Sequence, residues 1–115
     1  MSKSINTLTR QLRDLNSDTR SKAAMNLGEM GAEEAVPSII SAFKSEQNED
    51  VRSVFAETFA LFGHMDSVVK TLISAKNNDT SAKVKISAEW SLGQIAKKRG
   101  HASIQELIDS FGSQK

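Results

Sequence analysis

The sequence predicts an all-α protein in which pairs of helices stack into a short α-α solenoid. Three observations lead to this fold class. A block of thirteen residues recurs three times, its apolar positions fit one face of a helix, and no segment alternates apolar and polar residues as a strand would. We therefore expect a single repeat domain over residues 1–115, with about seven helices in roughly three and a half helix pairs.

The recurring block begins at positions 19, 51 and 84, so its copies are offset by 32 and 33 residues. The copies read TRSKAAMNLGEMG, VRSVFAETFALFG and VKISAEWSLGQIA. Block positions 1, 5, 8, 9 and 12 are apolar or small, although position 8 is polar in every copy. These positions fall within an arc of about 100° on a helical wheel. We expect helices near 19–31, 51–63 and 84–96, each with this face buried.

Helical patterns also fill the segments before, between and after the blocks. They lie, in chain order, at 5–15, 35–43, 67–75 and 102–111. Val36 and Val68 hold equivalent places and are 32 residues apart, as the blocks are, so the repeating unit is a helix pair. The last segment is expected to be a terminal capping helix.

Turn residues fit these helix boundaries. Aspartates precede the blocks, where a side-chain oxygen accepts from free backbone N–H groups, and glycines follow them, where left-handed caps favour glycine. The expected N-caps are Asp18, Asp50 and the cluster Asn77-Asn78-Asp79, and the expected C-caps are Gly31, Gly63 and Gly100.

Composition excludes several classes of protein. With 38% hydrophobic and 25% charged residues, the chain is neither disordered nor membrane-embedded. The absence of cysteine excludes disulfides and thiolate metal sites. The first fifteen residues show no apolar core of a secretory signal, so we expect a cytoplasmic protein. A net charge of +1 argues against nucleic acid as a partner.

The blocks resemble the short HEAT-like repeat, of the kind found in phycobilin lyases and many small prokaryotic helical-repeat proteins. Its pattern is roughly D-x-x-V-R-x-x-A-A-x-A-L-G-x-L-G, matched by SDTRSKAAMNLGEMG and more loosely by EDVRSVFAETFALFG and AKVKISAEWSLGQIA. The resemblance covers about residues 8–111 and rests on packing residues. It implies that Arg20, Arg52 and Lys85 form ladders with the Asp residues between repeats rather than bind ligands.

Binding residues are expected on the outward face of the block helices, where positions 3, 7 and 14 project. Met25, Ile86 and Trp90 are apolar on this face, where solvent favours polar side chains. Exposed apolar patches often mark partner sites, and tryptophan is enriched in binding hot spots. We expect a groove anchored by Trp90 and gated by Glu57. The candidate binding residues are Ser21, Met25, Ser53, Glu57, Ile86, Trp90 and Lys97.

Each candidate also has a structural alternative. The terminal helix could fold back over Ile86 and Trp90, and Met25 could be a lone surface methionine of an ordinary kind. His64 and His101 each follow a glycine at a helix junction, but no carboxylate lies three or four residues after both. We therefore expect no metal site and no cofactor.

The sequence favours a non-enzymatic protein-binding scaffold or adaptor. It contains no G-x-S-x-G motif and no glycine-rich phosphate loop. The expected partner is a helix or loop of another protein, or a second copy of the chain. The resemblance to phycobilin lyases implies an alternative as a bilin-chromophore chaperone or lyase-like factor, although few bases lie on the proposed face to hold propionates. A second alternative is a DNA-binding HEAT-like domain, against which the low net charge argues.

Overall fold

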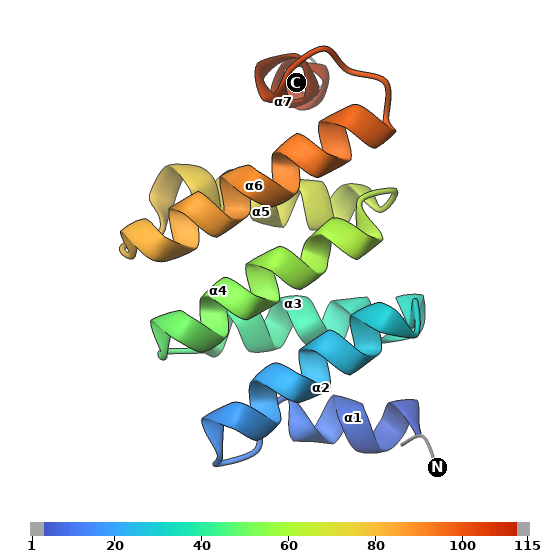
Figure 1. The fold of residues 1–115 in the computed structure, drawn as a ribbon, viewed down its shortest axis with the longest axis vertical. Helices are drawn as coiled ribbons and strands as arrows, with labels where there is room; N and C mark the ends of the chain where they lie inside the picture. The colour runs from blue at the N-terminus through green and yellow to red at the C-terminus, as the bar shows by residue number, and fades with distance from the viewer. Residues whose placement is uncertain (1–3, 113–115) are drawn as a thin grey trace.

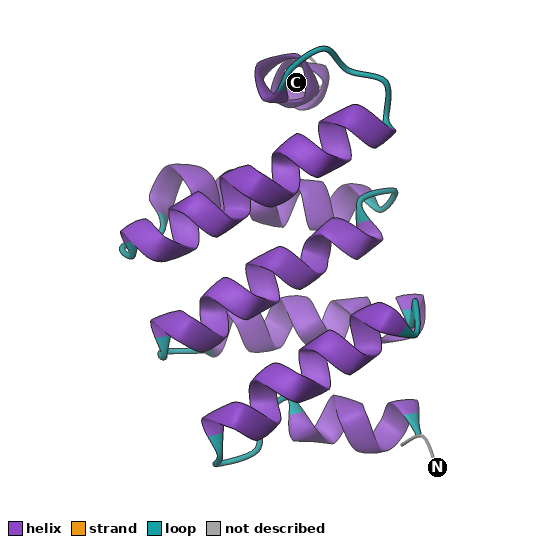
Figure 2. Cartoon of the chain, viewed as in Figure 1, coloured by secondary structure: helices purple, strands orange, loops and turns teal. Residues whose placement is uncertain are grey.

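The computed structural model describes residues 4–112, and every regular element within that range is helical (Figure 2). The α-helices are α1 (Ile5–Gln11), α2 (Ser17–Glu29), α3 (Val36–Ser45), α4 (Glu49–Thr58), α5 (Asp66–Asn78), α6 (Ala82–Lys98) and α7 (Ile104–Gly112). Two short 3₁₀ helices are η1 (Glu33–Ala35) and η2 (Phe59–Phe62). The predicted all-α fold class is confirmed.

The helices form two layers of a short α-α solenoid. Helices α2, α4 and α6, which contain the three blocks, run in the same direction side by side in Figure 1. Helices α1, α3 and α5 lie behind them and run the opposite way, so each block helix pairs with the helix before it. Helix α7 is seen end-on and crosses the C-terminal end of the stack.

Each block helix begins two residues before its block, which corrects the expected N-caps. The observed N-caps with a side-chain hydrogen bond are Asn16 for α2, Asn48 for α4 and Ser81 for α6. Asp18 and Asp50 lie instead in the first turn of their helices. A carboxylate there is favoured by the positive end of the helix dipole. Asp79 precedes Ser81 and pairs with an arginine described below.

Two of the three expected glycine caps are left-handed. Gly31 and Gly100 have φ of 63° and 81°, which suits a residue without a Cβ. Gly63 has φ of −66°, so the expectation of a left-handed cap there is wrong. Packing explains the glycine at this position instead, because a Cβ on residue 63 would lie 2.4 Å from Cγ1 of Ile95.

Replacing Gly63 with alanine is expected to lower the free energy of unfolding by about 1–3 kcal/mol, because the added methyl overpacks a filled core. The same change at Gly93 is the matched control. A Cβ there would lie 3.7 Å from Cδ1 of Ile104, an ordinary contact. Because Gly93 is inside α6, alanine should raise stability by about 0.5–1 kcal/mol. Urea unfolding followed by circular dichroism measures both, and effects of equal sign would contradict this account.

The core lies between the two layers. Block positions 5 and 9 are buried in all copies: Ala23, Leu27, Phe55, Phe59, Ala88 and Leu92. Position 12 is buried as Phe62 and Ile95, but Met30 is 45% exposed, contrary to the expectation. Ile95 packs against Gly63 of the preceding copy, whereas no copy precedes Met30.

Arginines at block position 2 connect successive loops through acidic side chains. Arg52 pairs with an aspartate, as the resemblance implied, whereas Arg20 pairs with a glutamate instead. Nε and Nη2 of Arg20 donate to the two carboxylate oxygens of Glu46, at 2.7 and 3.0 Å. Its Nη1 donates to the backbone carbonyls of Asp14 and Leu15, at 2.8 and 3.2 Å. Arg20 therefore connects the loop before α2 to the loop before α4.

Arg52 repeats this arrangement one helix pair further on. Its Nη2 pairs with Asp79, and its Nη1 donates to the carbonyls of Phe43 and Glu46 at 2.7 and 3.0 Å. The guanidinium carbon also lies 4.5 Å from the centre of the Phe43 ring. Lys85, at the equivalent position of the third block, forms no ion pair with another residue of the range 4–112.

Candidate functional site

Small side chains bring the block helices close together. Oγ of Ser91 on α6 donates to the carbonyl oxygen of Ala56 on α4, at 2.7 Å. Between α2 and α4, Gly28 leaves room for Thr58 and Leu61, since a Cβ at residue 28 would lie 2.8 Å from Cγ2 of Thr58. The junctions between neighbouring block helices are therefore narrow, and larger side chains lie on both sides of each junction.

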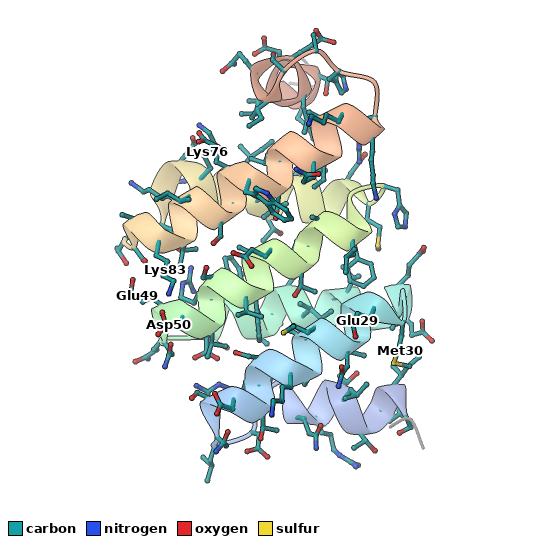
Figure 3. The ribbon with its side chains drawn as sticks, viewed as in Figure 1. Glu29, Met30, Glu49, Asp50, Lys76 and Lys83 are labelled. Carbon is teal, nitrogen blue, oxygen red and sulfur yellow. The ribbon has the colours of Figure 1, made fainter. Side chains whose placement is uncertain are left out.

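A groove of about 370 Å³ lies along these junctions. The seventh residue of every block lines it: Met25 from α2, Glu57 from α4 and Trp90 from α6. The other lining residues are Glu29 (labelled in Figure 3), Val54, Thr58, Ala60 and Leu61. The groove thus contains residues from three successive repeats.

The groove is apolar with an acidic component. Three of its large side chains remain about half exposed: Trp90 at 54%, Leu61 at 51% and Met25 at 47%. Its only ionisable lining residues are the carboxylates Glu29 and Glu57. Such a surface suits apolar contact with a partner and repels anions.

Glu57 is held in position by a neighbouring helix. Oγ of Ser87 on α6 donates to Oε2 of Glu57 at 3.2 Å. Lys83, in the first turn of α6, pairs with Asp50, and both are labelled beside the start of α4 in Figure 3. The hydrogen bond and charge of Asp50 raise the pKa of Lys83, and Glu57 contributes in the same direction. Lys83 is therefore already paired, away from the groove lining.

The structure brings together three of the seven sequence-predicted binding residues, Met25, Glu57 and Trp90. Ile86 is 69% exposed and lies one turn before Trp90 on α6, next to the groove rather than in it. Of the others, Lys97 is exposed near the end of α6, and Ser21 is half-buried on α2.

Ser53 departs from the expectation, because it is buried. Its hydroxyl shares a hydrogen bond with that of Ser87, inside the junction between α4 and α6. Position 3 of the second block therefore faces the next block helix instead of the open face. In this arrangement Ser53 does not lie on the open face.

Trp90 is not covered by the terminal helix. Helix α7 packs over Gly93, where Ile104 approaches, and over the end of α6, where the Arg99 guanidinium lies 5.5 Å from the centre of the Phe111 ring. The alternative in which residues 102–111 cover Ile86 and Trp90 is therefore wrong. Met25 is likewise more than a lone surface methionine, since it shares the groove with Trp90.

Leu61 is a large groove residue that the sequence did not predict, because the prediction used only block positions 3, 7 and 14. It occupies block position 11 and lies against Gly28, with 3.0 Å between its Cδ1 and a Cβ built on that glycine. The signal that finds it is the small residue at block position 10 in every copy: Gly28, Ala60 and Gly93. Small residues at one helical position indicate close approach of a neighbouring helix.

Two other hollows, of about 360 and 320 Å³, surround Arg52 and Arg20. They are equivalent places in successive repeats, and each guanidinium already pairs with an acidic side chain. His64 pairs with Glu33 of the preceding repeat, with Nε2 and Oε2 2.7 Å apart. Within the described part of the chain, no cluster of three or more His, Cys, Asp or Glu residues is arranged to hold a metal ion.

None of the helices in residues 4–112 combines the length and the apolar character that crossing a bilayer requires.

Comparison with known proteins places these repeats in a family. The model of HEAT repeats matches residues 1–60, which is more than half of the 115 residues and includes the first block and most of the second. No curated protein matches the chain. The narrower resemblance to the phycobilin-lyase type stays a prediction. With its paired helices, arginine ladder and family match, the chain belongs to the HEAT repeat family.

Proposed function

We propose that this chain is a non-enzymatic scaffold or adaptor that binds a helix or loop of another protein, or a second copy of itself, in the groove lined by Met25, Glu57 and Trp90. HEAT repeats commonly serve as scaffolds for protein interactions. The observation that carries the proposal is the meeting of three half-exposed apolar side chains, Met25, Leu61 and Trp90, in one groove.

The energetics of such a groove favour a protein partner. A partner that covers the apolar side chains gains about 25 cal/mol of favourable free energy for each Å² of apolar surface that it removes from water. The lining residues project from packed helices, so the backbone needs little further ordering when a partner binds. A tryptophan surrounded by smaller contacts is the usual composition of a binding hot spot.

The charge of the groove counts against the two alternatives. Bilin propionates and DNA phosphates are anions, and Glu29 and Glu57 would repel them. Neither lysine nor arginine is among the lining residues. The groove therefore supports protein binding over bilin handling or DNA binding.

Replacing Trp90 with alanine is expected to weaken partner binding by at least about 30-fold, the effect of losing a hot spot of about 2 kcal/mol. The experiment is a quantitative pull-down from a lysate of the source organism, followed by affinity measurement on the recovered partner. Met25→Ala should weaken binding less. Met30→Ala is its matched control, because Met30 is 45% exposed and follows the same helix but lies outside the groove.

Light scattering and thermal unfolding of the same variants separate the outcomes. A wild-type dimer that becomes a monomer on Trp90→Ala identifies a second copy as the occupant. Recovery of the same proteins by wild type, Trp90→Ala and Met30→Ala, all folded, would show that the groove is not the binding surface.

A further inference from the structure

The two carboxylates of the groove constrain what can cover it. Glu29 and Glu57 lie beside Met25, Leu61 and Trp90, and no lining residue carries a positive charge. A wholly apolar partner would take these carboxylates out of water without pairing them, which is costly. A partner that carries a cation at this point avoids that cost.

Glu57 is prepared for such a cation. Ser87 already donates to Oε2, which fixes the carboxylate against α6. No group among residues 4–112 donates a hydrogen bond to the other oxygen, Oε1. Lys83, whose pKa responds to Glu57, is bound to Asp50 and does not line the groove. One acceptor is therefore available to an incoming donor.

Trp90 adds a second feature that favours a cation. Its indole lines the same groove as Glu57 and is 54% exposed. A lysine or arginine head group is attracted to the face of an indole, and more strongly when it is desolvated. The long apolar stems of these side chains also pack well on apolar surfaces such as Met25 and Leu61.

We infer that the occupant of the groove is a basic amphipathic segment of a partner protein, in which a lysine or arginine that pairs with Glu57 and lies against Trp90 is flanked by apolar side chains. This inference rests on the proposed function and specifies its partner. An acidic segment is repelled by Glu29 and Glu57, and a neutral one leaves them unpaired.

The test begins with selection from a displayed library of helical peptides, using the full chain as bait. The library makes the chemistry of the occupant an outcome of the experiment. Enriched peptides are screened again on Trp90→Ala, which separates groove binders from binders of other surfaces. We expect the Trp90-dependent peptides to be enriched in Lys or Arg next to Leu, Ile, Met or Phe.

Titration of one enriched peptide then measures the role of Glu57. Trp90 is the only tryptophan of the chain, so its fluorescence reports directly on the groove. Glu57→Gln should weaken binding about tenfold, the worth of a charge-assisted hydrogen bond. The matched control is Glu89→Gln, an exposed carboxylate of α6 that does not line the groove, and it should leave the affinity unchanged.

Two outcomes separate this inference from the proposed function. Trp90-dependent peptides without an excess of basic residues, or peptides that bind Glu57→Gln as tightly as wild type, would overturn the inference while the groove stays a binding site. A selection that yields no Trp90-dependent peptide would count against both.

Discussion

Replacing Phe59 with alanine is expected to lower the free energy of unfolding by about 3–5 kcal/mol, the usual cost of truncating a buried phenylalanine. Phe59 is fully buried in η2. Its ring meets that of Phe43 edge to face, with centroids 5.6 Å apart and planes 83° apart. Because small domains are stable by only about 5–15 kcal/mol, this loss removes much of the total. Urea unfolding followed by circular dichroism measures it.

Phe59→Leu is the control for this prediction. Leucine keeps most of the apolar volume and loses the ring contact with Phe43, which is worth about 0.5–1.5 kcal/mol beyond burial. An alanine variant as stable as the leucine variant would show that the site collapses around the lost ring, contrary to the expectation.

The second large effect is expected at Asp79. Its side chain is 3% exposed and pairs with Arg52, and its Oδ1 accepts from the backbone N–H of Ser81 at the start of α6, at 2.9 Å. Asp79→Ala removes both interactions and leaves the guanidinium without its counterion. We expect a loss of about 3 kcal/mol, the low end for a broken buried pair. Arg52 keeps 19% side-chain exposure, so water offsets part of the cost.

Two further variants identify the cause. Asp79→Asn keeps an oxygen for the N–H of Ser81 but loses both the charge and the second acceptor, which faces Arg52, so its stability should lie between those of wild type and Asp79→Ala. Lys83→Met breaks the exposed pair with Asp50 and should leave the urea midpoint unchanged, because exposed pairs contribute little. If Asp79→Ala were as stable as Lys83→Met, the ion pair between Arg52 and Asp79 would contribute nothing to the stability of the fold.

The architecture was predictable because helix burial imposes a period on the sequence. Leu27, Phe55, Leu92 and their neighbours at positions 5 and 9 must lie on one face if each block is to bury it. Met30 breaks the pattern: Ile95 at the same position is buried against Gly63 of the copy before it, whereas Met30 has no copy before it. Boundaries were less predictable, because Asn16 and Asn48 compete with Asp18 and Asp50 as caps and all four are good capping residues.

The candidate site was predictable only in part, for a related reason. A helical wheel orders side chains around one helix, and on that basis Met25, Glu57 and Trp90 share a direction. It does not give the rotation between neighbouring helices, which turns Ser53 toward Ser87 and away from solvent. Leu61 reaches the groove because Gly28 has no side chain, which is a property of the pair rather than of either helix.

The assembly of the groove from α2, α4 and α6 has a thermodynamic consequence. Among residues 4–112, no side-chain hydrogen bond or ion pair spans more than the 36 residues between Arg99 and Gly63, so each repeat is tied mainly to its neighbours. A partner seated in the groove would contact the first, second and third repeats at once. By mass action it would stabilise the folded array as a whole. We expect the three repeats to unfold together when the partner is bound, whereas in the free chain a repeat at either end can unfold by itself.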